Sequence, residues 1–127
     1  MIRFECDYAE GAAPQLLERL TRTNLEQTPG YAVDGHCQRA RDLIRAACAA
    51  PQAEVEFLVG GTQANQTVIS AALRPYQGAL CAQTGHINVH ETGAIEATGH
   101  KVLPLPSQDG KITPKQVEQF CAVHWAD

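Results

Sequence analysis

Hydrophobic positions in the first third of the chain recur at the spacing of helices. Pro14 suits the first position of a helix, and a short apolar stripe follows it at Leu16, Leu17 and Leu20. A second and clearer pattern, at i, i+3, i+4, i+7 and i+8, runs through Ala40, Leu43, Ile44, Ala47 and Cys48. Asp34 is well placed to be its N-cap. We therefore predict that residues 1–50 form a helical N-terminal segment.

Beyond residue 50 the pattern changes to short apolar runs that alternate with helical stretches. The runs predict strands over residues 54–59, 78–82 and 101–105. Helices are predicted over residues 62–73 and 89–98, and from the start signature Thr113-Pro114-Lys115-Gln116 onward. Such alternation is typical of an α/β domain with a mostly parallel sheet flanked by helices. The pattern stops where another strand would be expected, so we interpret residues 51–127 as the start of such a domain.

Composition narrows the classes of function. The chain has 127 residues, 44% hydrophobic and 19% charged, which suffices for a buried core. Its net charge of −4 comes without a Lys/Arg cluster, so we expect no nucleic-acid partner. The apolar runs are too short to span a membrane, and the acidic N-terminus lacks the apolar region of a signal peptide.

Cysteine usage indicates the compartment. The chain has five widely spaced cysteines and no Cys-x-x-Cys motif: Cys6, Cys37, Cys48, Cys81 and Cys121. This pattern favours a reduced, cytoplasmic protein with buried thiols, and it gives little support to a metal site.

The strongest chemical signal lies where the first predicted strand meets a helix, at Gly60-Gly61-Thr62. A tight turn into a helix directs free backbone N–H groups and the positive end of the helix dipole at one point, where a phosphate fits. The glycines allow close approach of the backbone, and Thr62 can cap the helix and donate its hydroxyl to a phosphate oxygen. The alternative is an ordinary turn in which Thr62 is only a cap. The phosphate motifs Gly-x-x-x-x-Gly-Lys-Ser/Thr and Gly-x-Gly-x-x-Gly are absent, so a nucleotide-binding domain ranks last.

Three segments together resemble the low-specificity threonine aldolases: residues 57–65 (FLVGGTQAN), 84–95 (TGHINVHETGAI) and 99–101 (GHK). That family belongs to the β-eliminating lyase group of pyridoxal-phosphate enzymes, with the aspartate-aminotransferase-like fold, fold type I. The resemblance runs from Asp7 through the turn at Gly110. It implies that the chain is the N-terminal part of the large, cofactor-binding domain of such an enzyme.

The resemblance implies roles for individual residues. Gly61, Thr62 and Gln63 match the positions that hold the phosphate of the cofactor. His86 matches the histidine that stacks on the pyridine ring close to the substrate hydroxyl, and Glu91 matches an acid at the same site. A neutral imidazole in that place can both stack and serve the transfer of the hydroxyl proton. His86 and Glu91 are therefore the candidate catalytic residues.

Two departures from the family pattern concern the rest of the site. Cys6 stands, next to Asp7, where many members have a serine that helps to hold the substrate carboxylate, and a thiol is a weaker hydrogen-bonding group. Family members are also much longer than this chain. The lysine that forms the Schiff base has no counterpart here, because Lys101 starts a strand and Lys111 and Lys115 flank a turn and a helix start.

The resemblance thus implies a lyase that cleaves a β-hydroxy-α-amino acid to glycine and an aldehyde, working as a homo-oligomer, dimer or tetramer, with this segment incomplete alone. The alternative is a non-catalytic fragment that binds phosphate or cofactor weakly, or that associates with a partner through an unfinished sheet. Alternatives for the residues also stay open. In the alternative interpretation, His86 is a loop histidine that is bonded to backbone groups, and Glu91 only complements the dipole of a helix. A metal pair of His86 with His90 is disfavoured, because His86 comes at or before the helix start.

Overall fold

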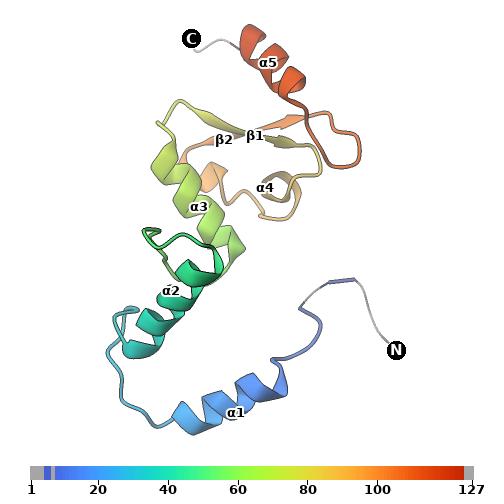
Figure 1. The fold of residues 1–127 in the computed structure, drawn as a ribbon. Coiled ribbons are helices and arrows are strands. Elements are labelled where there is room, and N and C mark those ends of the chain that lie inside the picture. The colour runs from blue at the N-terminus through green and yellow to red at the C-terminus, as the bar shows by residue number, and fades with distance from the viewer. Residues whose placement is uncertain (1–4, 7, 125–127) are drawn as a thin grey trace. The chain divides into compact units, whose positions relative to one another are not determined.

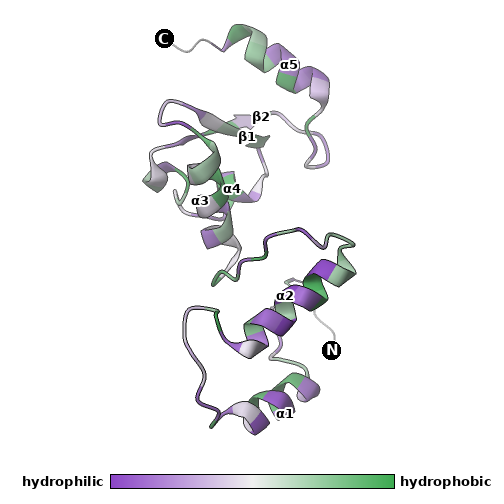
Figure 2. Ribbon diagram, turned by 60° about the vertical axis from the view of Figure 1, so that its left-hand side comes forward, coloured by the Kyte–Doolittle hydropathy of each residue, from purple (hydrophilic) through white to green (hydrophobic). Residues whose placement is uncertain are grey.

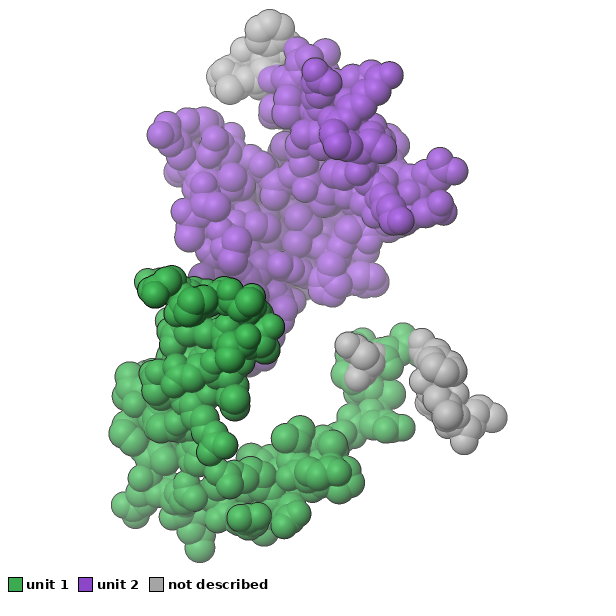
Figure 3. All heavy atoms as spheres, viewed as in Figure 1, with its two compact units in different colours: residues 1–56 green, residues 57–127 purple. Residues whose placement is uncertain are grey.

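The computed structural model describes residues 5, 6 and 8–124. The expectations for the first four residues, for Asp7 and for the last three residues lie outside this part of the chain. Contacts divide the chain into two compact units, residues 1–56 and 57–127, which Figure 3 shows in different colours. Figure 1 labels the helices and strands. The architecture is mixed α/β with a parallel sheet, as the sequence predicts.

The first unit holds two helices, α1 (Pro14–Thr23) and α2 (Gly35–Ala47), and both were predicted. Asp34 is the N-cap of α2, because one oxygen of its carboxylate accepts from the backbone N–H groups of His36 (2.9 Å) and Cys37 (3.0 Å). Neither helix has a fully buried residue within its own bounds. Hydrophobic and hydrophilic positions alternate around both helices (Figure 2).

Arg41 ties the two loops of the first unit to α2. Its Nε donates to the carbonyl of Val55 at 3.0 Å, and one terminal nitrogen donates to the carbonyl of Ala32 at 2.7 Å. Ala32 and its neighbour Tyr31 have φ of 59° and 62°, a backbone region that side chains disfavour. The planar guanidinium therefore holds a strained turn before α2 to the segment that follows α2.

The second unit is built on two parallel strands, β1 (Gly78–Ala82) and β2 (Lys101–Leu105), in register from Gly78 with Lys101 to Ala82 with Leu105. Both strands were predicted. The connection between them forms the short helices α4 (His86–Val89) and η1 (Glu96–Thr98), and Gly99 ends η1 in the left-handed conformation, φ 86°. The small core of this unit consists of Ala82, Ile95, Val102 and Leu105.

Helices α3 (Gly61–Ala72) and α5 (Pro114–Val123) complete the second unit. The predicted capping box of α5 is present: Gln116 N–H donates to Thr113 Oγ1, and Thr113 N–H donates to Gln116 Oε1. Among the described residues, no helix combines the length and apolar character needed to cross a membrane.

Two predicted elements are wrong. Residues 54–59 belong to no strand of the described part of the chain, and Val59 lies in a bend. The predicted helix over residues 89–98 is broken between α4 and η1. Thr92 and Gly93 have φ of 48° and 79°, and right-handed helix cannot continue through such residues.

Expectations about burial also failed at several side chains. His100 carries no pattern in the sequence that predicts burial, yet it is only 6% exposed and its Nδ1 lies 3.3 Å from the carbonyl oxygen of Gln77. The thiols were expected to be buried, but Cys48 and Cys121 are exposed and the other three are half-buried. All five are free thiols.

Candidate functional site

The N-terminus of α3 presents backbone N–H groups without a side-chain cap. Gly60, in fully extended conformation, is the N-cap residue, and among the described residues no side chain makes a capping hydrogen bond there. Thr62 is the second residue of the helix, so the prediction that it caps α3 is wrong. The first intrahelical bond joins Ala64 N–H to the carbonyl of Gly60 at 3.1 Å. The N–H groups of residues 61–63 therefore lie at the positive end of a helix of 12 residues.

Open space surrounds the turn that leads into α3. Apart from the adjacent residues and the backbone of α3, no heavy atom of the described residues lies within 4 Å of the position that a Cβ would take on Gly60 or Gly61. Their φ angles also do not call for glycine, so nothing within the described chain requires glycine at either position. Gln63 closes the turn, since its Oε1 accepts from Val59 N–H at 2.8 Å. The arrangement fits a phosphate, which would take the space and the free N–H groups together.

A tight turn after β1 sets the position of His86. Gly85 N–H donates to the carbonyl of Ala82 at 2.7 Å, and a Cβ on Gly85 would lie 2.9 Å from that same oxygen. Only glycine fits this turn, and His86 follows it as the first residue of α4. Gln83 N–H donates to the carbonyl of Leu105, so the ends of the two strands meet at one edge. The carboxyl edge of parallel strands is where ligands commonly bind in α/β folds.

Three side chains from three segments meet next to this turn. His86 Nδ1 lies 2.8 Å from Glu91 Oε1, and Asn65 Nδ2 of α3 donates to the same oxygen at 2.5 Å. The Glu91 side chain is 0% exposed, whereas that of His86 is 63% exposed. The structure therefore brings the two predicted catalytic residues into contact, with the carboxylate buried and the imidazole exposed.

The alternatives for these residues now narrow. Glu91 lies beyond the C-terminal end of α4, so it does not complement a helix N-terminus there. The side-chain partner of His86 is a carboxylate rather than a backbone group. The rings of His86 and His90 are 5.3 Å apart and tilted by 49°. Within the described residues, no three His, Cys, Asp or Glu side chains are grouped to hold a metal ion.

Other predicted residues belong to other parts of the fold. Cys6 is half-buried and belongs to the first unit. Lys101, Lys111 and Lys115 are all exposed, so none has the desolvated surroundings of a Schiff-base lysine.

Sequence reasoning missed Asn65 and Gln66 as members of the site. Gln66 Nε2 donates to the carbonyl of Ala94 at 2.9 Å, so both neighbouring amides tie α3 to residues 91–94. Asn65 comes four residues after Gly61, and positions i and i+4 share one face of a helix. This spacing from the diglycine turn was the signal available in the sequence.

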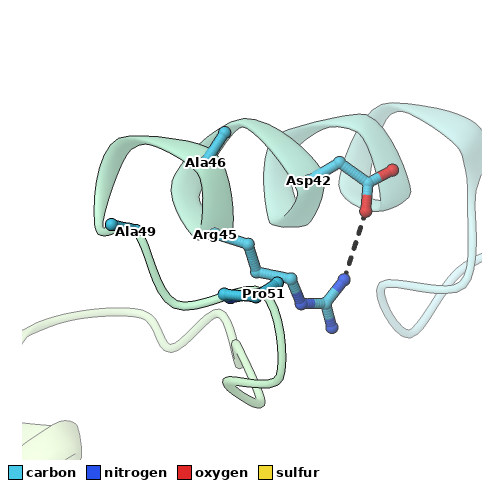
Figure 4. A pocket seen from close by; sticks show the side chains of 5 residues that line it. All are labelled: Asp42, Arg45, Ala46, Ala49 and Pro51. Carbon is cyan, nitrogen blue, oxygen red and sulfur yellow. Dashed lines mark hydrogen bonds and ion pairs between the residues drawn. The ribbon is translucent and has the colours of Figure 1, made fainter.

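A cavity of about 380 Å³ occurs elsewhere, in the first unit (Figure 4). Asp42, Arg45, Ala46, Ala49 and Pro51 line it. Its charged groups already satisfy each other, because Arg45 Nη1 lies 3.2 Å from Asp42 Oδ1 and Arg45 Nε donates to the carbonyl of Ala53. None of the predicted site residues belongs to this cavity, and we assign it no function.

Fold and site together define an α/β protein in which α3 begins without a side-chain cap and His86 lies within hydrogen-bond distance of a buried carboxylate. The chain belongs to the β-eliminating lyase family, because the sequence profile of that family matches residues 6–126. Members of this family use pyridoxal phosphate.

Individual relatives agree with this assignment. The chain is 29% identical, over 119 residues, to the low specificity L-threonine aldolase of Pseudomonas sp. strain NCIMB 10558, covering 92% of this chain and 34% of the relative. The enzyme of the same name from Pseudomonas aeruginosa gives 29% over 120 residues, with 93% and 34% covered. A solved structure of Leishmania major threonine aldolase superposes with a TM-score of 0.86 at 46% identity, covering 89% of this chain and 33% of that one. The chain thus spans about a third of the length of these relatives.

Proposed function

We propose that this chain supplies the phosphate-binding turn and the ring-stacking histidine of a pyridoxal-phosphate-dependent lyase of the threonine-aldolase type. The whole protein cleaves a β-hydroxy-α-amino acid, such as threonine, to glycine and an aldehyde. The contact of His86 with buried Glu91, which Asn65 ties to α3 and its uncapped N-terminus, is the observation that carries the proposal. Membership of the family and the likeness to threonine aldolases support it.

Each part of the site has a task in this proposal. The N–H groups of Gly61, Thr62 and Gln63 and the hydroxyl of Thr62 bind the phosphate of the cofactor. Bound pyridoxal phosphate would supply an electron sink for the substrate bond that breaks. His86 lies against the ring, and its Nε2 accepts the proton of the substrate hydroxyl. Cys6 takes the place of the serine that holds the substrate carboxylate.

The 127-residue chain alone lacks a lysine suited to the covalent link with the cofactor. All three of its lysines are exposed, whereas the Schiff-base role needs an amine shielded from water. We therefore expect that reduction with borohydride in the presence of pyridoxal phosphate leaves no specific lysine adduct on this chain. We also propose that the whole protein is a cytoplasmic homo-oligomer that takes a small amino-acid substrate.

Phosphate recognition can be tested on the chain itself. Titration of the ¹⁵N-labelled chain with pyridoxal phosphate should shift the amide signals of Gly61, Thr62 and Gln63. Pyridoxal, which lacks the phosphate, is the matched control and should leave these three signals in place. Gly60→Ala should keep the stability, because a Cβ there meets open space, yet weaken the binding. Equal shifts with both compounds, or shifts confined to other residues, would overturn the proposal.

The role of His86 is tested in the whole protein. His86→Asn removes the proton acceptor, so cleavage of threonine should slow by about 10²–10⁴-fold in kcat, the usual contribution of a general base. His90→Asn is the control, since His90 has no carboxylate contact among the described hydrogen bonds, and it should retain most of the activity. Similar losses in both variants would contradict the assignment.

A second candidate, association with a partner, has one observation in its favour. Leu58 and Val59 belong to no described strand, and they are 43% and 97% exposed. Such a segment can pair with another strand. A purified chain that stays monomeric at high concentration in light scattering would count against this role.

A further inference from the structure

The hydrogen-bond pattern around His86 determines which ring nitrogen carries the proton. Nδ1 lies 2.8 Å from Glu91 Oε1, and an ionised carboxylate can only accept. The hydrogen must therefore lie on Nδ1. In a neutral imidazole the other nitrogen, Nε2, is then the acceptor.

Asn65 fixes the oxygen to which the imidazole donates. Its Nδ2 donates to the same Oε1, from the first half of α3. The neighbouring amide of Gln66 anchors the same helix to the carbonyl of Ala94, three residues past Glu91. The carboxylate is thus held between a helix and a loop, and its position does not depend on the exposed imidazole.

Stability does not account for this arrangement. Glu91 has no exposed side-chain surface, and its second oxygen, Oε2, has no hydrogen-bond partner among the described residues. An unpartnered buried carboxylate oxygen costs free energy. Among these residues, the Glu91 side chain accepts hydrogen bonds only from the His86 imidazole and the Asn65 amide.

We propose that Asn65 and Glu91 are positioning residues that hold His86 as the Nδ1–H tautomer, with Nε2 presented outward as a proton acceptor. The chemical use of that acceptor, toward a substrate hydroxyl, rests on the function proposed above. The tautomer itself is a property of the chain without cofactor. It can therefore be tested separately from phosphate binding.

The test is a long-range ¹H–¹⁵N correlation spectrum of the histidine rings in the 127-residue chain at pH 8.5, where histidines are ordinarily neutral. His86 should show a protonated Nδ1 and an unprotonated Nε2. His36 is an internal reference of the opposite kind, because its Nε2 lies 2.8 Å from Glu26 Oε2 and should carry the proton. An Nε2–H tautomer at His86, or an even mixture, would overturn the proposal.

Variants then separate positioning from general structure. In Glu91→Gln the amide can both accept and donate, so the single tautomer should give way to a mixture. Asn65→Leu should shift the population in the same direction by freeing the carboxylate. Gln66→Leu is the matched control, since it removes the neighbouring α3 amide that bonds Ala94 but not the carboxylate, and the His86 tautomer should be unchanged.

The outcomes divide as follows. A tautomer unchanged in Glu91→Gln, or equally disturbed in Gln66→Leu and Asn65→Leu, contradicts the proposal. Should one variant fail to give a dispersed amide spectrum, the other variant and the wild-type tautomer still decide. A third result has pyridoxal phosphate leave the amide signals of residues 61–63 unshifted while His86 shows the expected tautomer. That result would reject the proposed function, but this inference would still hold.

Discussion

Gly78 lies so close to the carbonyl of Lys101, its partner in the parallel ladder, that a Cβ would come within 2.7 Å of that oxygen. The same Cβ would lie 2.8 Å from the Leu103 side chain. Gly78→Ala should therefore force the first ladder pair apart and destabilise the second unit by about 1–3 kcal/mol, the usual cost of overpacking. Urea unfolding measures the change. Gly35→Ala, where a Cβ meets nothing within 4 Å among the described residues, is the control and should not lower the midpoint.

The capping box of α5 gives a prediction about its first turn. Thr113→Ala removes the acceptor of Gln116 N–H and should cost about 1 kcal/mol, whereas Thr113→Ser keeps the hydroxyl and most of the stability. Hydrogen exchange at the Gln116 amide reports the change directly. Equal exchange in the alanine and serine variants would show that the cap does not protect this amide.

The cap of α2 should make the start of that helix sensitive to acid. Two hydrogen bonds with Cys37 lower the pKa of Asp34 below its usual range. The one with its side chain has the larger effect, and the one with its backbone N–H comes next. Such a carboxylate has a lower pKa in the folded chain than in the unfolded chain. Its contribution to stability is fully present above the pKa of the unfolded chain, and it is lost as the pH falls through the pKa of the folded chain. The amide signals of His36 and Cys37 should therefore move only below about pH 4. Asp34→Asn keeps an acceptor and should abolish this transition.

Thiol reactivity should follow burial. Burial raises the pKa of the half-buried Cys81 thiol in β1, so less thiolate is present at a given pH. At pH 8 Cys81 should react with iodoacetamide more slowly than the exposed Cys121, as measured by peptide mass spectrometry. In urea the two rates should become similar. A difference that persists in the unfolded chain would assign the effect to local sequence instead.

Local sequence signals predicted the elements that depend on local interactions. The capping box at Thr113 and the cap at Asp34 each act within one helical turn, and both are present. The two strands of the ladder were also predicted, since each is an apolar run between turn residues.

The predictions failed where the structure of a segment depends on a partner that is far away in the sequence. Residues 54–59 have the composition of a strand, but composition cannot supply a neighbouring strand. His100 carried no local sign that it would be buried against Gln77. The resemblance to a family brought His86 and Glu91 to attention, but the contact of Asn65 with Glu91 joins positions 26 apart and needed the structure.

The link between β1 and β2 also bears on how the second unit folds. α4 has four residues and η1 has three, and helices this short do not persist on their own in water. They last only while the strands on either side are paired. A synthetic peptide of residues 84–99 would contain both His86 and Glu91, yet would sample many arrangements of the two. The imidazole–carboxylate contact therefore forms in the same cooperative event as the ladder, and its appearance during refolding marks completion of the unit.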